Sequence, residues 1–170
     1  IKTNGYFHSL KDAFHNYTPT YIYALVLIAK LDLYPLYAIK FLSIAFDYII
    51  AYFVGQMAFM VTKKENIKWI AFAVIPIIPT VVLNGALMSQ CDAIYATFAI
   101  GSAYFLLKNK LVTSMIFLGL AFSLKAQAAM VLPFFFVFML RGGIRWYYFL
   151  IIPLVYVITI LPVWIMGRPL

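Results

Sequence analysis

Residues 84–95 read NGALMSQCDAIY and place an amide, a hydroxyl, a thiol and a carboxylate between two apolar runs. These runs, 69–83 and 93–107, are each about 15 residues long, which as helix is about 22 Å and shorter than the roughly 30 Å bilayer core. Irregular polar backbone at that depth is tolerated only where protein buries it or where it lines a wet cavity. We therefore predict a membrane protein whose loop 84–92 lines a cavity.

The composition agrees with an integral membrane protein. Of the 170 residues, 66% are hydrophobic, 19% are aromatic and only 11% are charged, unlike a soluble domain. The net charge of +8 does not indicate a nucleic-acid partner, because the 13 Lys and Arg stand in small groups between apolar runs, as loop anchors do. No basic start and apolar signal core precede the polar segment 2–16, so we expect the chain to be a fragment.

The apolar runs predict an all-α, polytopic bundle with about six transmembrane helices and one juxtamembrane helix. The run 21–29 is too short to cross and is expected to lie at the interface, at the end of an outer loop that comprises 1–35. Pro76 and Pro79 should bend the second span. The expected spans in the bundle 36–170 are 36–61, 69–83, 93–107, the two halves of 111–140, and 146–166.

Length decides how the run 111–140 folds. As one helix it would be about 45 Å long with Lys125 near its middle, where a charge costs several kcal/mol. Two shorter helices hinged at Lys125 avoid that cost. The hinge also puts the basic loops 63–68, 108–110 and 141–145 on one side, which the positive-inside rule makes cytoplasmic. The N-terminal segment, the loop 84–92 and the hinge then share the outer face.

Two polar pairs on that face are candidate functional groups. Asp92, with Gln90 before it, suits orienting a sugar hydroxyl, holding a metal or acting as a base. The alternative is that Asp92 only caps the helix that starts at residue 93. Lys125 with Gln127 suits a phosphate or pyrophosphate, since the next helix N-terminus adds partial positive charge. The alternative is a lysine that reaches toward lipid headgroups.

Two further groups of ionisable residues share helical faces. His8, Asp12 and His15 can bind zinc or manganese if 5–16 is helical, although a surface amphipathic helix explains their spacing better. Lys40 and Asp47 lie two turns apart in the span 36–61. Intramembrane charges usually face the bundle interior with a partner, so an ion pair or a hydrogen bond to a neighbouring helix is favoured over a proton pathway.

Three sequence blocks, taken in order, resemble the GT-C superfamily of multispanning glycosyltransferases. Within it they are most similar to the bacterial and archaeal proteins related to GPI mannosyltransferases. The blocks are NYTPTYIYAL at 16–25, LNGALMSQCDAIYATFAIGSAYFLLKNK at 83–110, and FLGLAFSLKAQAAMVLPFFF at 117–136. The likeness covers most of 16–140, and its strength is the order of the blocks. The chain departs from the pattern at Ser89, where the family has glycine, and at Ala126, where proline is frequent.

The resemblance implies an enzyme that moves a sugar, such as mannose or another hexose, with inversion from a polyprenyl-phosphate donor. The acceptor is a glycan, a lipid or a protein on the extracytoplasmic face of a bacterial or archaeal plasma membrane. Such enzymes carry their catalytic carboxylate in the loop after the first span, which we expect upstream of Ile1. Asp12 is the only local carboxylate, and its position alone does not make it the catalytic base. Whether Mg²⁺ or Mn²⁺ takes part stays open.

The resemblance also assigns residues to the substrate. Gln90 and Asp92 match the family's second acidic block, and Lys125 and Gln127 match the block on the phosphate side. Tyr17 matches the entry of the juxtamembrane helix.

Two readings from other classes compete with the enzyme. A transporter or flippase would use Lys40 and Asp47 as a coupling pair and would need paired broken helices related by a repeat, which the sequence does not display. A non-catalytic scaffold subunit would not need the polar cluster on the outer face. Chemistry with a nucleotide bound in a soluble fold is not indicated, because the chain has no Gly-rich phosphate loop and no serine nucleophile elbow.

Overall fold

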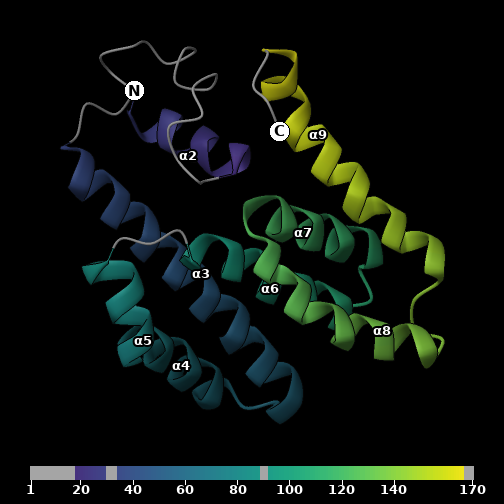
Figure 1. Cartoon of the computed structure of the whole chain (residues 1–170). Helices are drawn as coiled ribbons and strands as arrows, with labels where there is room; N and C mark the ends of the chain where they lie inside the picture. The colour runs from purple at the N-terminus through teal and green to yellow at the C-terminus, as the bar shows by residue number, and fades with distance from the viewer. Residues whose placement is uncertain (1–17, 30–33, 89–91, 167–170) are drawn as a thin grey trace.

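A computed structural model describes residues 18–29, 34–88 and 92–166 of the chain (Figure 1). These residues form helices joined by short turns and contain no strand, as the apolar runs predict. The helices are α2 (Pro19–Ala29), α3 (Pro35–Thr62), α4 (Glu65–Val74), η1 (Ile75–Ile77), α5 (Pro79–Val82), η2 (Leu83–Leu87), α6 (Asp92–Leu107), α7 (Leu111–Leu124), η3 (Ala126–Val131), α8 (Leu132–Leu140), η4 (Trp146–Leu150) and α9 (Ile151–Ile165).

The expected number of about six spans is wrong for the described residues. Two helices are long and apolar enough to cross a membrane, Leu36–Thr62 and Trp146–Ile165. A third arises if Glu65–Ile77 and Pro79–Gly85, which are bent by 48°, form one span. The reason is length, because the other apolar helices have 10–17 residues and a crossing needs about 20.

The predicted breaks in the apolar runs are confirmed. The run 69–83 bends where Pro76 lies in η1 and Pro79 begins α5, since proline lacks the N–H that continues a helix. The run 111–140 is interrupted at Lys125, whose backbone is extended at φ −157° and ψ 127°. The helix then resumes as the 3₁₀ turn η3 and continues as α8.

Helices α3, α6, α7 and α9 pack in that order, with α6 between α3 and α7 and with α7 against α9. The larger apolar cluster joins α6, α7, α8 and the turn after α8. Its buried residues are Leu106, Met115, Leu118, Phe135 and Ile144. A second cluster holds α2 onto the bundle and consists of Tyr21, Ile94 and Leu124. This second cluster brings together elements from all three sequence blocks of interest.

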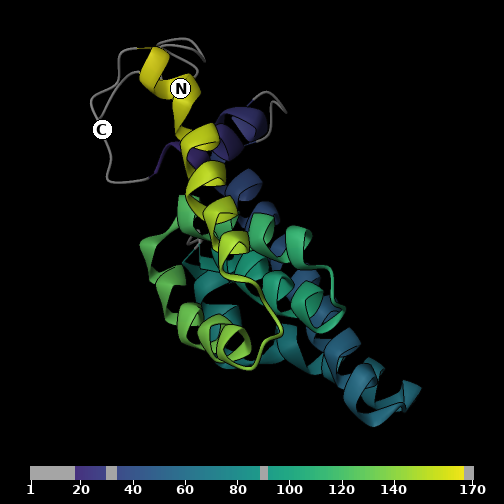
Figure 2. The same ribbon diagram turned by 90° about the vertical axis from the view of Figure 1, so that its right-hand side faces the viewer.

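The ends of the helices separate into two groups (Figures 1 and 2). The turns that follow α3 and α8, both rich in basic residues, lie at the bottom and lower right of Figure 1. Helix α2, the N-terminal end of α3 and the C-terminal end of α9 lie toward the top, and the same separation holds in the perpendicular view. Which of the two groups faces the cytoplasm stays a prediction.

Candidate functional site

Three segments that are far apart in sequence meet beside the break after α7. The Thr18 hydroxyl, just before α2, donates a hydrogen bond of 3.0 Å to the carbonyl oxygen of Leu124, the last residue of α7. Tyr21 packs against Ile94 of α6 and against Leu124. The entry of α2, the start of α6 and the end of α7 therefore form one location.

An ion pair joins two of these segments. Lys125 Nζ lies 2.5 Å from Asp92 Oδ1, although the two residues are 33 positions apart. The two side chains retain 33% and 24% of their exposure, so the pair is sheltered and still accessible. Because the pair is charge-assisted and partly desolvated, its hydrogen bond is stronger than one between neutral groups.

The backbone and one aromatic ring set the position of Lys125. Its N–H donates to the Ala121 carbonyl oxygen at 3.0 Å, which closes α7, and the extended conformation then turns the side chain away from the helix axis. The ammonium also lies 5.3 Å from the centre of the Tyr95 ring. A cation at that distance is attracted by the face of the ring. Tyr95 thus supports Lys125 in addition to Asp92.

Asp92 is the first residue of α6, whereas a helix cap is the residue just before the helix. Its carboxylate accepts the Lys125 hydrogen bond and at the same time lies at the positive end of the helix dipole. The two favourable interactions are compatible. Capping alone therefore does not account for this carboxylate.

An open apolar groove of about 400 Å³ begins at the same break. It is lined by Thr18, Phe122, Ala126, Ile152, Pro153 and Tyr156, from α2, α7, η3 and α9. Ala126 follows Lys125 directly, so the groove adjoins the residue that carries the ammonium.

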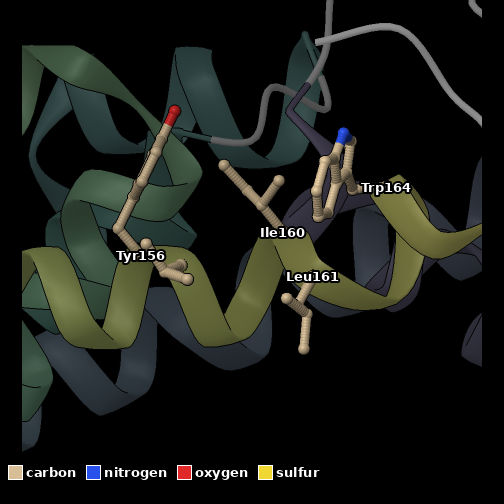
Figure 3. A pocket seen from close by; sticks show the side chains of 5 residues that line it. Tyr156, Ile160, Leu161 and Trp164 are labelled. Carbon is tan, nitrogen blue, oxygen red and sulfur yellow. The ribbon is translucent and has the colours of Figure 1, made fainter.

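A second groove of about 250 Å³ continues along α9 and shares Tyr156 with the first (Figure 3). Tyr156, Ile160 and Trp164 are four residues apart, and the figure shows that they project from one side of the helix. We call these two grooves, which share Tyr156, the apolar track along α9; its wider groove includes Ala126, the residue after Lys125.

Sequence reasoning missed the environment of Asp47. This residue is only 7% exposed, and its Oδ2 atom occupies the space that a Cβ at Gly85, in the π-helical turn η2, would need. Both Lys40 and Asp47 are described, and they form no ion pair with each other; of the two alternatives left open, an ion pair or a hydrogen bond to a neighbouring helix, the ion pair between these two residues is therefore not formed. The glycine in NGAL was a usable signal, because a π turn with glycine allows close approach of another helix.

Of the remaining predicted site residues, the structure describes only Gln127. Gln127 lies on η3 with an exposed side chain. Tyr17, Gln90 and Asp12 lie outside the described residues, as do His8 and His15. Within the described ranges, no three His, Cys, Asp or Glu side chains are grouped so that they could hold a metal ion. A role for Mg²⁺ or Mn²⁺ stays a prediction.

Thr18, Tyr95 and Tyr156 were not predicted as site residues. Tyr95 lies one helical turn after Asp92, and this spacing was a readable signal. Thr18 and Tyr156 reach the site only through tertiary packing. Comparison with family models, curated proteins and solved structures finds no match for this chain.

Proposed function

We propose that this chain belongs to a membrane glycosyltransferase that takes a sugar from a polyprenyl-phosphate donor and passes it to an acceptor on the extracytoplasmic face. The observation that carries the proposal is the Lys125 and Asp92 ion pair at the meeting point of the three blocks that resemble such enzymes. The apolar track that begins beside Lys125 supports it.

The chemistry of the donor matches the two halves of this location. A polyprenyl phosphate has a long apolar chain and an anionic head. The track along α9 is lined mainly by aliphatic and aromatic side chains and suits the chain. Lys125 is one residue from the start of the track, so it can meet the phosphate at the end of the same molecule. In this binding mode the protein needs no polar side chain beside the lipid chain.

The proposed reaction is an inverting displacement at the anomeric carbon of the sugar. The bond from this carbon to the phosphate oxygen breaks as the acceptor oxygen forms the new bond, and the phosphate leaves with the electron pair. Lys125 stabilises the negative charge that develops on that phosphate. Asp92 holds the ammonium in place before the donor arrives and then faces the sugar hydroxyls. A base from elsewhere in the protein takes the acceptor proton.

A transporter is less well supported. Its coupling pair would be Lys40 and Asp47, which form no ion pair, and Asp47 instead packs against Gly85. Such a close fit leaves little space beside the carboxylate for a moving ion.

Substitution of Lys125 tests the phosphate role. In the complete protein, Lys125→Ala is expected to weaken binding of a polyprenyl phosphate about tenfold, since a desolvated charge pair contributes more than a surface one. Lys125→Arg should recover part of the loss, because the guanidinium keeps the charge but changes the geometry. Lys110→Ala, at the opposite and exposed end of α7, is the matched control. Unchanged donor binding in Lys125→Ala would refute the role.

Cysteine accessibility tests which side of the membrane carries this location. Cysteines introduced at Asn66, Asn109 and Gly142 are expected to react only with reagents that reach the cytoplasm. A cysteine at Ala126, which is exposed beside Lys125, should react only from outside. Gly85 is unsuitable for labelling, because any side chain there would overlap Asp47. Labelling of Ala126→Cys from the cytoplasm would contradict the outward orientation.

A further inference from the structure

The turn between α3 and α4 has an unusual combination of charge and shape. Lys63 and Lys64 form the turn, and Glu65 and Lys68 lie in the first turn of α4; we count these four residues as the turn, which gives it a net charge of +2 (three positive minus one negative). The turn follows directly on Thr62, where the candidate span of α3 ends. Basic side chains at the end of a span lie at the level of the lipid headgroups.

A groove of about 110 Å³ runs between the two helices beside these charges. It is lined by Tyr52, Gly55, Gln56, Lys68, Trp69 and Phe72. Gly55 makes the close approach of the helices feasible, since a Cβ there would lie 2.9 Å from the carbonyl oxygen of Lys68. The groove is therefore a built feature of the helix pair, and it has both a basic and an aromatic wall.

Lys68 is held in one orientation at the edge of this groove. Its side chain is 20% exposed, and its ammonium lies 4.8 Å from the Trp69 ring centre and 5.7 Å from that of Phe59. Glu65 pairs with it at 3.0 Å but is 60% exposed. Because the glutamate is largely exposed, this pair is weak, and an incoming anion does not have to displace a strong partner. Lys68 is thus a cation held in place at the edge of the groove.

We propose that this turn binds one anionic phospholipid. The phosphate lies between Lys64 and Lys68, and the upper part of an acyl chain lies in the groove against Trp69. Charge complementarity selects the occupant, because a zwitterionic headgroup presents no net charge to a turn of +2. Anionic lipids concentrate in the cytoplasmic leaflet, where the positive-inside rule places this turn. The inference does not depend on the proposed sugar transfer, since it uses neither Lys125 nor Asp92.

Quenching of Trp69 fluorescence by brominated lipids tests the proposal. The other two tryptophans are first replaced in Trp146→Phe/Trp164→Phe, so that the signal comes from Trp69 alone. The full chain is then placed in phosphatidylcholine nanodiscs that contain a minor share of lipid with brominated acyl chains. That lipid is either anionic phosphatidylglycerol or phosphatidylcholine. We expect phosphatidylglycerol to quench with an apparent affinity about tenfold higher, given the contribution of each basic residue near a surface.

Charge variants identify the residues that hold the phosphate. Lys64→Gln/Lys68→Gln should abolish the preference for phosphatidylglycerol, and Lys64→Arg/Lys68→Arg should keep it. Lys64→Gln alone, at an exposed position, carries little risk to the fold and should lose about fivefold. The matched control is Lys108→Gln/Lys110→Gln, which removes two exposed charges from another turn and leaves the preference unchanged. Lys108 also lies over an aromatic ring, that of Tyr104, at 4.8 Å.

Three results would overturn the proposal. Equal quenching by the two brominated lipids would mean that the groove does not select charge. An equal loss in the control pair would mean that general surface potential explains the preference. Displacement of the quenching lipid by inorganic phosphate at millimolar concentration would mean that the turn binds free phosphate and not a lipid.

Discussion

Asp92→Asn is expected to lower the rate of sugar transfer at least about tenfold, equivalent to about 1.4 kcal/mol in the transition state, while the protein folds and inserts normally. Asparagine keeps the shape and the ability to accept a hydrogen bond at the start of α6, so a capping role would survive. It loses the charge that holds Lys125 at 2.5 Å. The measurement is turnover with a lipid-linked donor, together with thermal unfolding in detergent.

A double variant separates the two roles of the ion pair. If Asp92 only neutralises Lys125, then Asp92→Asn/Lys125→Gln should be as active as Lys125→Gln alone. If Asp92 also faces the sugar, the double variant should be less active than either single one, since the two losses are then separate. Full activity in Asp92→Asn would leave this carboxylate with a structural role and would remove the main chemical support for the proposed function.

Gly85→Ala is expected to destabilise the protein by about 1–3 kcal/mol, the usual cost of forcing an extra carbon into a well-packed interior. The added methyl group would overlap Oδ2 of Asp47, which is 7% exposed and cannot swing into solvent. The strain falls on the turn η2, which leads toward Asp92. We therefore expect lower thermal stability in detergent and a weaker Lys125 and Asp92 pair, measured as lower donor binding.

Removal of the opposing carboxylate is the control for this prediction. Asp47→Ala/Gly85→Ala should recover most of the lost stability, because the space vacated by the carboxylate accepts the new methyl group. Gly119→Ala provides a comparison elsewhere in the bundle, since a Cβ there would lie 2.8 Å from the Cβ of Val155. It should destabilise the protein to a similar extent; because the same Cβ would lie 3.2 Å from the carbonyl oxygen of Ile152, which lines the wider groove, the comparison is of thermal stability alone. A Gly85→Ala protein of normal stability would show that the turn can move away from α3.

Much of the local structure could be predicted from residues that control the backbone directly. Pro76 and Pro79 predicted the bend after α4, and Lys125 in an apolar run predicted the break after α7; both are confirmed. The ends of α3 and α6 lie within a residue or two of the predicted ones. These features depend on a missing N–H, on a charge in a hydrocarbon environment and on the length of apolar runs, all of which are properties of neighbouring residues.

The number of spans was predicted wrongly because apolar runs were also the basis for counting membrane crossings. Apolar character was taken as evidence of crossing, but α6 and α7 are apolar helices that end after 16 and 14 residues. Such helices bury much of their surface against each other, with Ser102, Ser114 and Gly101 at buried positions. Hydrophobicity thus indicates removal from water and does not distinguish a lipid neighbour from a protein neighbour.

The sequence by itself determined the all-helical class, the positions of the breaks and the identity of the two charged residues, Asp92 and Lys125, as unusual. Only the tertiary structure decided that these two are partners and that Tyr95 supports the ammonium. It also decided that Gly85, not Lys40, is the neighbour of Asp47. The physical reason is that a partner across 33 residues depends on how α6 and α7 pack, and packing is a property of many side chains together that no local pattern encodes.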